Sequence, residues 1–127
     1  RNWPYSYRWN GDILEVRCNT AIYNIHRNVV DNASGFSWES AQARNVRYDN
    51  VSGTFGFISK AAYAALLAKG RFTYDGITWR KVDETAENIH VRADKDNTEM
   101  WIAKDRELPI VMKMKNNPLG IDWDMKQ

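Results

Sequence analysis

The chain contains two histidines, His26 and His90, and a pair of histidines can cleave RNA by acid–base chemistry. One imidazole removes a proton from the attacking group while the other protonates the leaving group. A cation would stabilise the charge that develops on phosphorus, and Arg27 and Arg92 lie close to the two histidines in the sequence. No spacing brings His26 and His90 together, so a small hydrolase such as a ribonuclease-type toxin is the alternative function that the sequence leaves open.

A second group of polar side chains gathers around Trp101 if the flanking strands pair as their alternation predicts. A four-residue turn at 94–97 sets His90 opposite Trp101 and Arg92 opposite Glu99. An exposed indole among charged groups could stack on a sugar ring or receive a protein partner. The pattern also fits a solvated sheet face with weak cross-strand ion pairs. We predict a glycan- or protein-binding site on this outer face, formed by His90, Arg92, Glu99, Trp101 and Lys113.

The opposite, inner face of the same strands is rich in methionine. Flexible thioethers can line an adaptable apolar pocket, and a curved sheet covered by a helix would suit a lipid or another small apolar ligand. Ordinary core packing, in which methionine fills gaps, is the alternative interpretation. We predict an apolar pocket lined by Trp79, Met100, Met112, Met114 and Trp123.

Other chemistry lacks a sequence signature. The acidic turn at 94–99 has neither the spacing nor the glycine of an EF-hand calcium loop. Nucleophile elbows, phosphate-binding loops, dinucleotide fingerprints and zinc spacings are absent from the sequence. Cys18 is the only cysteine, so an intrachain disulfide is impossible. The sequence therefore predicts no catalytic residue, no metal site and no cofactor.

One helix is clearly marked among the elements that must position these residues. Ser59 can cap its N-terminus, and the alanine-rich segment that follows has high helix propensity. Gly70 suits the position just after the last turn. Tyr63, Leu66 and Leu67 share one stripe of this helix, so the spacing predicts an apolar contact face on a helix over 59–69.

The chain after this helix predicts an antiparallel β-meander of about six strands. Asp75-Gly76 is a two-residue hairpin signal that pairs Tyr74 with Ile77 and Phe72 with Trp79. These four residues form an aromatic-rich face.

Keeping apolar residues on one face also predicts the register of the later strands. A five-residue loop after residue 103 places Ile102 opposite Ile110 and Met100 opposite Met112. The turn at 115–120 then places Met112 opposite Trp123. The lengths of three loops each place the apolar residues on the same face of the sheet, and this consistency supports the predicted meander.

The first half of the chain is less regular. Segments 3–9 and 12–18 predict two strands around an Asn10-Gly11 turn, with Leu14, Val16 and Cys18 pointing inward. Residues 21–30 fit helical spacing, yet their types favour a strand. Residues 38–46 predict a short helix, and 46–57 an extended segment with bends at its glycines.

Composition limits the remaining functions. The 127 residues are 43% hydrophobic and 27% charged, which is typical of one soluble globular domain, here 1–127. A net charge of +2 gives no broad electrostatic surface for nucleic acid, and no apolar stretch is long enough to span a membrane. The chain begins at Arg1, from which we expect an exported protein, periplasmic or secreted.

These observations predict an α+β fold: an antiparallel meander of about six strands and N-terminal strands, packed with one well-defined helix over 59–69 and one or two short helices. The leading functional hypothesis is a non-catalytic binding or interaction domain of an exported, bacterial-type protein. Its partner would be a small apolar ligand, a glycan or a protein, and a homodimer through the outer face is open. The sequence does not specify the ligand.

Overall fold

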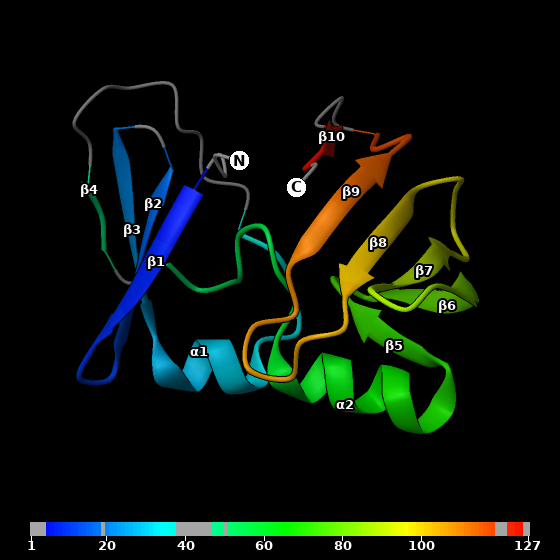
Figure 1. The fold of residues 1–127 in the computed structure, drawn as a ribbon, viewed down its shortest axis with the longest axis horizontal. Helices are drawn as coiled ribbons and strands as arrows, with labels where there is room; N and C mark the ends of the chain where they lie inside the picture. Colours follow the sequence, from blue (N-terminus) through cyan, green and yellow to red (C-terminus); the bar gives the residue numbers. More distant parts are fainter. Residues whose placement is uncertain (1–4, 19, 38–46, 50, 119–121, 126–127) are drawn as a thin grey trace.

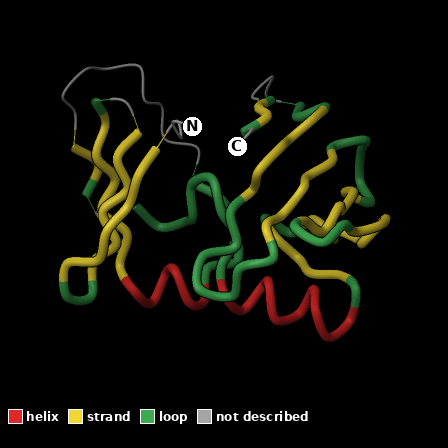
Figure 2. Tube along the Cα trace, viewed as in Figure 1, coloured by secondary structure: helices red, strands yellow, loops and turns green. Residues whose placement is uncertain are grey.

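The computed structural model describes residues 5–18, 20–37, 47–49, 51–118 and 122–125. A four-stranded sheet formed by the first half of the chain and a six-stranded sheet formed by the second half stand side by side above two helices (Figures 1 and 2). The predicted α+β architecture is confirmed. Among the described residues, no helix has the length and apolar character that crossing a membrane requires.

The first sheet has the strand order β1-β2-β3-β4. Its first three strands are antiparallel, and β4 runs parallel to β3. Leu14 and Val16 are fully buried, as predicted, whereas the side chain of Cys18 lies outside the described part of the structure. The strands are β1 (Tyr5–Asn10), β2 (Ile13–Cys18), β3 (Ala21–His26) and β4 (Arg47–Tyr48).

The turn between β1 and β2 differs by one residue from the prediction. Asn10 pairs with Ile13, so the two loop residues are Gly11 and Asp12 rather than Asn10 and Gly11. Gly11 has a φ of +61°, and the first loop position of a tight hairpin favours such a residue. The conformational freedom of the glycine, rather than the Asn-Gly pair, therefore determines the register.

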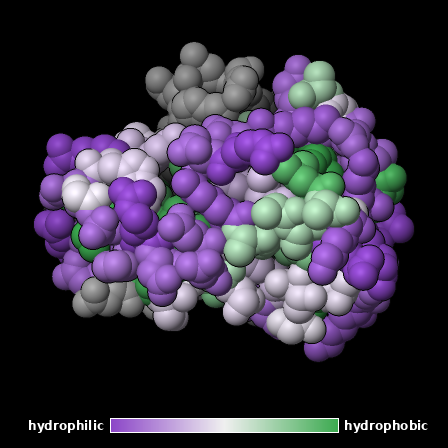
Figure 3. All heavy atoms as spheres, turned by 90° about the horizontal axis from the view of Figure 1, so that it is seen from below, coloured by the Kyte–Doolittle hydropathy of each residue, from purple (hydrophilic) through white to green (hydrophobic). Residues whose placement is uncertain are grey.

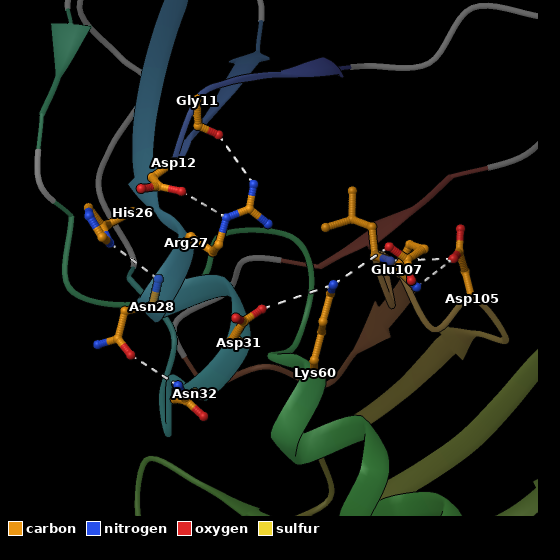
Figure 4. A network of polar contacts seen from close by, with 11 residues as sticks. Gly11, Asp12, His26, Arg27, Asn28, Asp31, Asn32, Lys60, Asp105 and Glu107 are labelled. Carbon is orange, nitrogen blue, oxygen red and sulfur yellow. Dashed lines mark hydrogen bonds and ion pairs between the residues drawn. The ribbon is translucent and has the colours of Figure 1, made fainter.

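The ambiguous segment 21–30 is divided between two elements. The β-prone residues form β3, and the chain then enters α1 (Arg27–Asn32). The Nδ1 atom of His26 accepts a hydrogen bond from the backbone N–H of Asn28 at 3.2 Å and so caps α1 (Figure 4). The short helix predicted over 38–46 lies outside the described residues.

The segment before the long helix runs between the sheets. It is extended at β4 and in two single bridges, which pair Phe36 with Thr54 and Phe57 with Ile110. A Cβ atom at Gly53 would lie only 2.6 Å from the backbone carbonyl carbon of Phe36. The close approach of these two backbones therefore requires glycine at position 53.

The second sheet is a meander in which every strand pairs with its sequence neighbours. All five pairings are antiparallel. The elements are α2 (Lys60–Lys69), β5 (Arg71–Tyr74), β6 (Ile77–Glu84), β7 (Asn88–Ala93), β8 (Glu99–Ala103), β9 (Val111–Lys115) and β10 (Trp123–Asp124).

The predicted registers hold for β5–β6 and for β7–β8, but the one predicted for β8–β9 is wrong. Met100 pairs with Met114 rather than Met112, and Ile102 pairs with Val111 rather than Ile110. Met112 is an extra residue in a β-bulge, which lets Val111 and Met114 both point inward. Trp123 consequently pairs with Met114 and not with Met112.

Helix α2 has the predicted caps but a narrower contact face. Ser59 Oγ accepts a hydrogen bond from the N–H of Ala62, and Gly70 ends the helix with a φ of +71°. Ala62, Tyr63 and Leu66 are buried, but Leu67 is 43% exposed, so its place in the predicted stripe is wrong.

The exposed side of α2 also carries apolar residues. Seen from the helix side, apolar residues gather on the molecular surface (Figure 3). The exposed apolar residues of α2 are Ala61, Ala64, Leu67 and Ala68.

Polar contacts join the two halves of the molecule. The side chain of Lys60 lies 4.0 Å from the Asp31 carboxylate on α1 and 3.6 Å from that of Glu107 in the β8–β9 loop (Figure 4). Ser59 Oγ also donates to the carbonyl oxygen of Ala33 at 2.6 Å. The start of α2 is thus the point where both sheets and both helices are connected.

Candidate ligand-binding site

A hollow lies at one end of the second sheet, and we call it the turn-end pocket. Consecutive antiparallel strands place every second turn at the same end, so the β5–β6, β7–β8 and β9–β10 turns meet there. The pocket has a volume of about 460 Å³, which lies within the range of small-molecule sites. It is lined by Phe36, Tyr74, Asp75, Ile77, Trp79, Lys95, Asp96, Thr98, Met114, Asn117 and Pro118.

Three aromatic residues, Phe36, Tyr74 and Trp79, line the pocket. The ring of Phe36 meets the ring of Tyr74 edge-on, with centroids 4.6 Å apart and planes at 71°. Trp79 stacks on Phe72 behind the wall, with a centroid distance of 6.4 Å and an angle of 12°. Each ring is therefore held by a neighbouring ring in a favourable geometry, which fixes the shape of the wall before a ligand enters.

Tyr74 also fixes the wall through its hydroxyl group. The hydroxyl accepts a hydrogen bond from the backbone N–H of Ser59 at 2.9 Å and shares another with Thr54 Oγ1 at 2.6 Å. Burial raises the pKa of Tyr74 above its ordinary value of 10.0, while these hydrogen bonds act in the opposite direction. The phenol is neutral at physiological pH and acts as a structural link.

One side of the pocket rim is the β5–β6 turn. Asp75 has a φ of +55°, and its carboxylate accepts a hydrogen bond from the backbone N–H of Phe36 at 3.2 Å. Its own N–H donates to the carbonyl oxygen of Ser34 at 2.8 Å. Both contacts tie this turn to the segment that carries Phe36.

The opposite side of the rim consists of the other two turns, which are bonded to each other. Thr98 Oγ1 donates to the carbonyl oxygen of Asn116 at 3.0 Å, and Asn116 Nδ2 donates to that of Asn97 at 3.2 Å. Hydrogen bonds from Thr98 hold the pKa of the Asp96 carboxyl below its usual value. The rim is therefore preformed on both sides.

Trp79 is unusual among the polar groups of this site. Its side chain is 5% exposed, and its Nε1 is the one buried side-chain nitrogen or oxygen without a hydrogen-bond partner in the described part of the chain. The indole of Trp123 differs, since its Nε1 donates to the carbonyl oxygen of Val111 at 2.8 Å. A buried N–H that lacks an acceptor costs about 1–3 kcal/mol.

Two of the five residues of the predicted apolar pocket, Trp79 and Met114, line the turn-end pocket. Met100 is fully buried in the apolar cluster behind it, and Trp123 packs against that cluster. Met112 is half-buried in the bulge of β9.

Sequence reasoning missed several residues of this site. Tyr74 and Ile77 belong to the aromatic-rich face of the first hairpin, and that pattern could have placed them here. Phe36 reaches the pocket from the other half of the chain through its single bridge with Thr54. No periodic pattern surrounds Phe36, so the sequence holds no local signal for its role.

Three of the five residues predicted for the outer face, His90, Trp101 and Lys113, lie in one row across the second sheet, and Arg92 pairs with Glu99 beside it. Successive cross-strand pairs join Asp83 to His90, His90 to Trp101, Trp101 to Lys113 and Lys113 to Asp124. We call this row the outer ladder.

The indole of Trp101 is held between its neighbours in the outer ladder. The His90 ring stacks on it at a centroid distance of 4.2 Å and an angle of 6°, and Lys113 Nζ lies 4.8 Å from the ring centroid. Because β7 and β9 flank β8, these two groups approach the indole from opposite sides. A sugar that stacked on Trp101 would have to compete with them.

His90 is engaged at both ring nitrogens. Nε2 lies 2.7 Å from Glu99 Oε1, and Nδ1 lies 3.2 Å from Asp83 Oδ1, while the residue is only 9% exposed. Arg92 also approaches Glu99 Oε1, at 3.9 Å. The five predicted outer-face residues thus form a connected set whose polar groups contact one another.

The two histidines of the hydrolase hypothesis belong to different sheets. His26 lies at the end of β3 and caps α1, whereas His90 lies in the outer ladder on β7. They share no partner in the contacts of the described residues. Within the same residues, no cluster of three or more His, Cys, Asp or Glu side chains is arranged to hold a metal ion.

Comparison with known proteins gives no match: no protein-family model, curated protein or solved structure corresponds to this chain.

Proposed function

We propose that this protein is a non-catalytic binding domain that takes up a small, mainly apolar molecule in the turn-end pocket. The observation that carries the proposal is a hollow of about 460 Å³ that the fold keeps open at one end of a sheet. Its wall is formed by aromatic rings, Ile77 and the thioether of Met114. Binding of an apolar ligand removes these apolar surfaces from water, which lowers the free energy of the complex.

The preformed rim supports the same proposal. The hydrogen bonds of Asp75 hold one side, and those between Thr98, Asn116 and Asn97 hold the other. A site that is already shaped loses little conformational entropy when a ligand binds. Affinity for small molecules therefore does not require a rearrangement of the sheet.

A blocked pocket tests the proposal. Ile77 lines the pocket, so Ile77→Trp adds bulk to the hollow. Val82→Trp is the matched control, because Val82 lies on the same strand, is exposed and does not line the pocket. The probe is the neutral dye N-phenyl-1-naphthylamine, whose fluorescence rises in apolar surroundings, and circular dichroism checks that each variant is folded.

We expect the original protein and Val82→Trp to bind the dye with equal affinity, and Ile77→Trp to bind it at least about tenfold more weakly, a loss of about 1.4 kcal/mol. Native mass spectrometry of the protein before and after denaturation provides a second measurement, since a retained small molecule would disappear with unfolding. Absence of dye binding, or equal binding by a folded Ile77→Trp variant, would contradict the proposal.

A further inference from the structure

The strands at the borders of the two sheets differ in the length of edge that they leave open. β4 and β10 have two residues each, and β5 has four. β1 has six residues and pairs with β2 along its whole length without a bulge (Figure 1). Short edge strands, bulges and several charges are common protection against pairing with another chain. Of the border strands that the structure describes, β1 is the long and regular one.

The free edge of β1 presents the backbone groups of alternate residues. A two-residue loop such as 11–12 is closed by a hydrogen-bonded pair, here Asn10 and Ile13. Bonding toward β2 then recurs at every second residue, so the N–H and C=O groups of Tyr7 and Trp9 point away from β2. Within the described residues, β2 is the one strand that pairs with β1. These outward groups are therefore open to another strand.

The aromatic side chains on the inner face of β1 are also exposed. Tyr7 pairs with Val16 and Trp9 with Leu14, and both partners are at most 1% exposed in the core of the first sheet. Directly paired residues share one face of a sheet, so Tyr7 and Trp9 lie on the core face. Tyr7 is nevertheless 44% exposed, and Trp9 is 38% exposed although the Arg27 guanidinium lies 4.1 Å from its ring centroid. The apolar face of the sheet thus continues past its covered part.

The sequence of β1 is complementary to itself. Antiparallel pairing about a two-fold axis at Tyr7 gives three kinds of cross-strand pair between two copies: Tyr7 with Tyr7, Trp9 with Tyr5, and Arg8 with Ser6. Aromatic residues then face aromatic residues, which is a favourable cross-strand combination.

Charge agrees with this register. Arg8 is the single charged residue of β1, and in the two-fold register it faces a neutral serine hydroxyl. Its guanidinium lies 3.5 Å from Glu15 of its own chain, on the side of β2. Like charges therefore do not face each other directly across the two strands.

We propose that two copies of this chain pair through their β1 strands, antiparallel and about a two-fold axis at Tyr7, and so join two four-stranded sheets into one. The pairing satisfies the backbone groups of both free edges and covers the exposed aromatic rings of each copy with those of the other. A contact between two six-residue strands is smaller than the standard interface of about 1,600 Å², so the dimer is reversible and its amount depends on protein concentration.

A charge exchange at Tyr7 tests the proposed register. Tyr7→Lys places two like charges opposite each other and should weaken dimerisation of the whole protein at least about tenfold in sedimentation velocity. Val82→Lys is the matched control, because Val82 is 46% exposed on β6 and lies outside β1, and it should dimerise like the original protein. A mixture of Tyr7→Lys and Tyr7→Glu should restore dimers, since opposite charges then meet. Circular dichroism checks that each variant is folded.

Amide hydrogen exchange tests the same register in the original protein. Raising the protein concentration should slow exchange at the N–H groups of Tyr7 and Trp9, which point to the free edge. The N–H of Arg8 points toward β2 and should exchange at the same rate at all concentrations. This alternation along one strand is expected for edge pairing and not for association through another surface.

Each result decides for or against the pairing. A monomer at every concentration up to about 1 mM overturns the proposal. A dimer that Tyr7→Lys leaves intact also overturns it, because another surface then holds the copies together. A dimer that Tyr7→Lys weakens, that the mixture of opposite charges restores and that protects alternate amides of β1 supports it.

Discussion

Tyr74 is the residue at which the pocket and the connection between the two halves meet. Its ring lines the pocket, and its hydroxyl bonds the helix cap at Ser59 and the bridged segment at Thr54. Tyr74, Ser59 and Thr54 are all fully buried. A change at this hydroxyl should therefore affect stability more than a change at an exposed tyrosine.

Removing the hydroxyl tests this expectation. Tyr74→Phe leaves the N–H of Ser59 without its acceptor, so we expect a loss of about 1–3 kcal/mol in the free energy of unfolding. Urea denaturation followed by circular dichroism measures it. Tyr7→Phe is the control, because Tyr7 is exposed, and it should change stability by less than about 0.5 kcal/mol. Equal effects of the two substitutions would show that the buried contacts contribute nothing.

Tyr74 also predicts how stability changes in alkali. Its pKa is raised in the folded protein, so its contribution is fully present below pH 10 and is lost as the pH rises above 10 towards the folded value. The midpoint of urea unfolding should fall across this range. For the Tyr74→Phe variant, the midpoint should fall less steeply with pH. Parallel curves of midpoint against pH for the two proteins would contradict the assignment to Tyr74.

Glu84 predicts the opposite dependence, in acid. Hydrogen bonds from Lys104 and Lys81 lower the pKa of Glu84 from 4.5 to about 2. A lowered pKa gives stability that is present above pH 4.5 and is lost as the pH falls towards 2. Glu84→Gln should therefore reduce the acid dependence of the melting temperature between pH 5 and pH 2, read by calorimetry at about 50 mM salt. Glu87→Gln, at a neighbouring exposed site, should leave it unchanged.

At the level of strands, the outer ladder couples neighbours across the sheet. The His90 ring and the Trp101 indole are nearly parallel and 4.2 Å apart. A double-mutant cycle with His90→Ala and Trp101→Ala should give a coupling energy of about 0.5–1.5 kcal/mol. A cycle between Trp101→Ala and Thr73→Ala on β5 should give a value near zero. A coupling near zero in the first cycle would mean that the stacked pair adds no stability.

The accuracy of the sequence predictions also varies from element to element. The Asp75-Gly76 turn and strict alternation specified the β5–β6 pairing, and Ser59 with Gly70 marked α2, because these signals are local. The bulge at Met112 shifts the β8–β9 register away from the predicted one. The sequence does not reveal the bulge, because the apolar alternation is regular on either side of the extra residue. Trp79 and Met114 could be placed in a pocket from their shared face. Phe36 could not, because only the packing of two distant segments brings it there.

At the level of the whole molecule, the two sheets are joined where Gly53 passes the backbone of Phe36. The pairing of Phe36 with Thr54 lies at this crossing, and Phe36 then lines the pocket. Stability and ligand binding should therefore both depend on a position that touches no ligand. Export from the cell stays a prediction.

Gly53→Ala tests that dependence. The added methyl group would lie 2.6 Å from backbone atoms, which cannot move aside as a flexible side chain would. We expect a loss of more than about 1 kcal/mol in stability and weaker binding of N-phenyl-1-naphthylamine. Ser52→Ala, at the exposed neighbouring position, should affect neither property. Thermal unfolding and dye titration measure them, and a Gly53→Ala variant as stable as the original protein would show that the crossing adapts.

The placement of three hairpin turns around one mouth has a consequence for how such a protein can diversify. Turns tolerate insertion and replacement far better than strands, because few backbone groups there are committed to the sheet. The β7–β8 and β9–β10 turns carry much of the rim, while β5 and β6 carry much of the wall. Under the proposed function, exchanging the loop sequences on an unchanged sheet should alter which ligands bind, so this end of the sheet is a starting point for engineering receptors of altered selectivity.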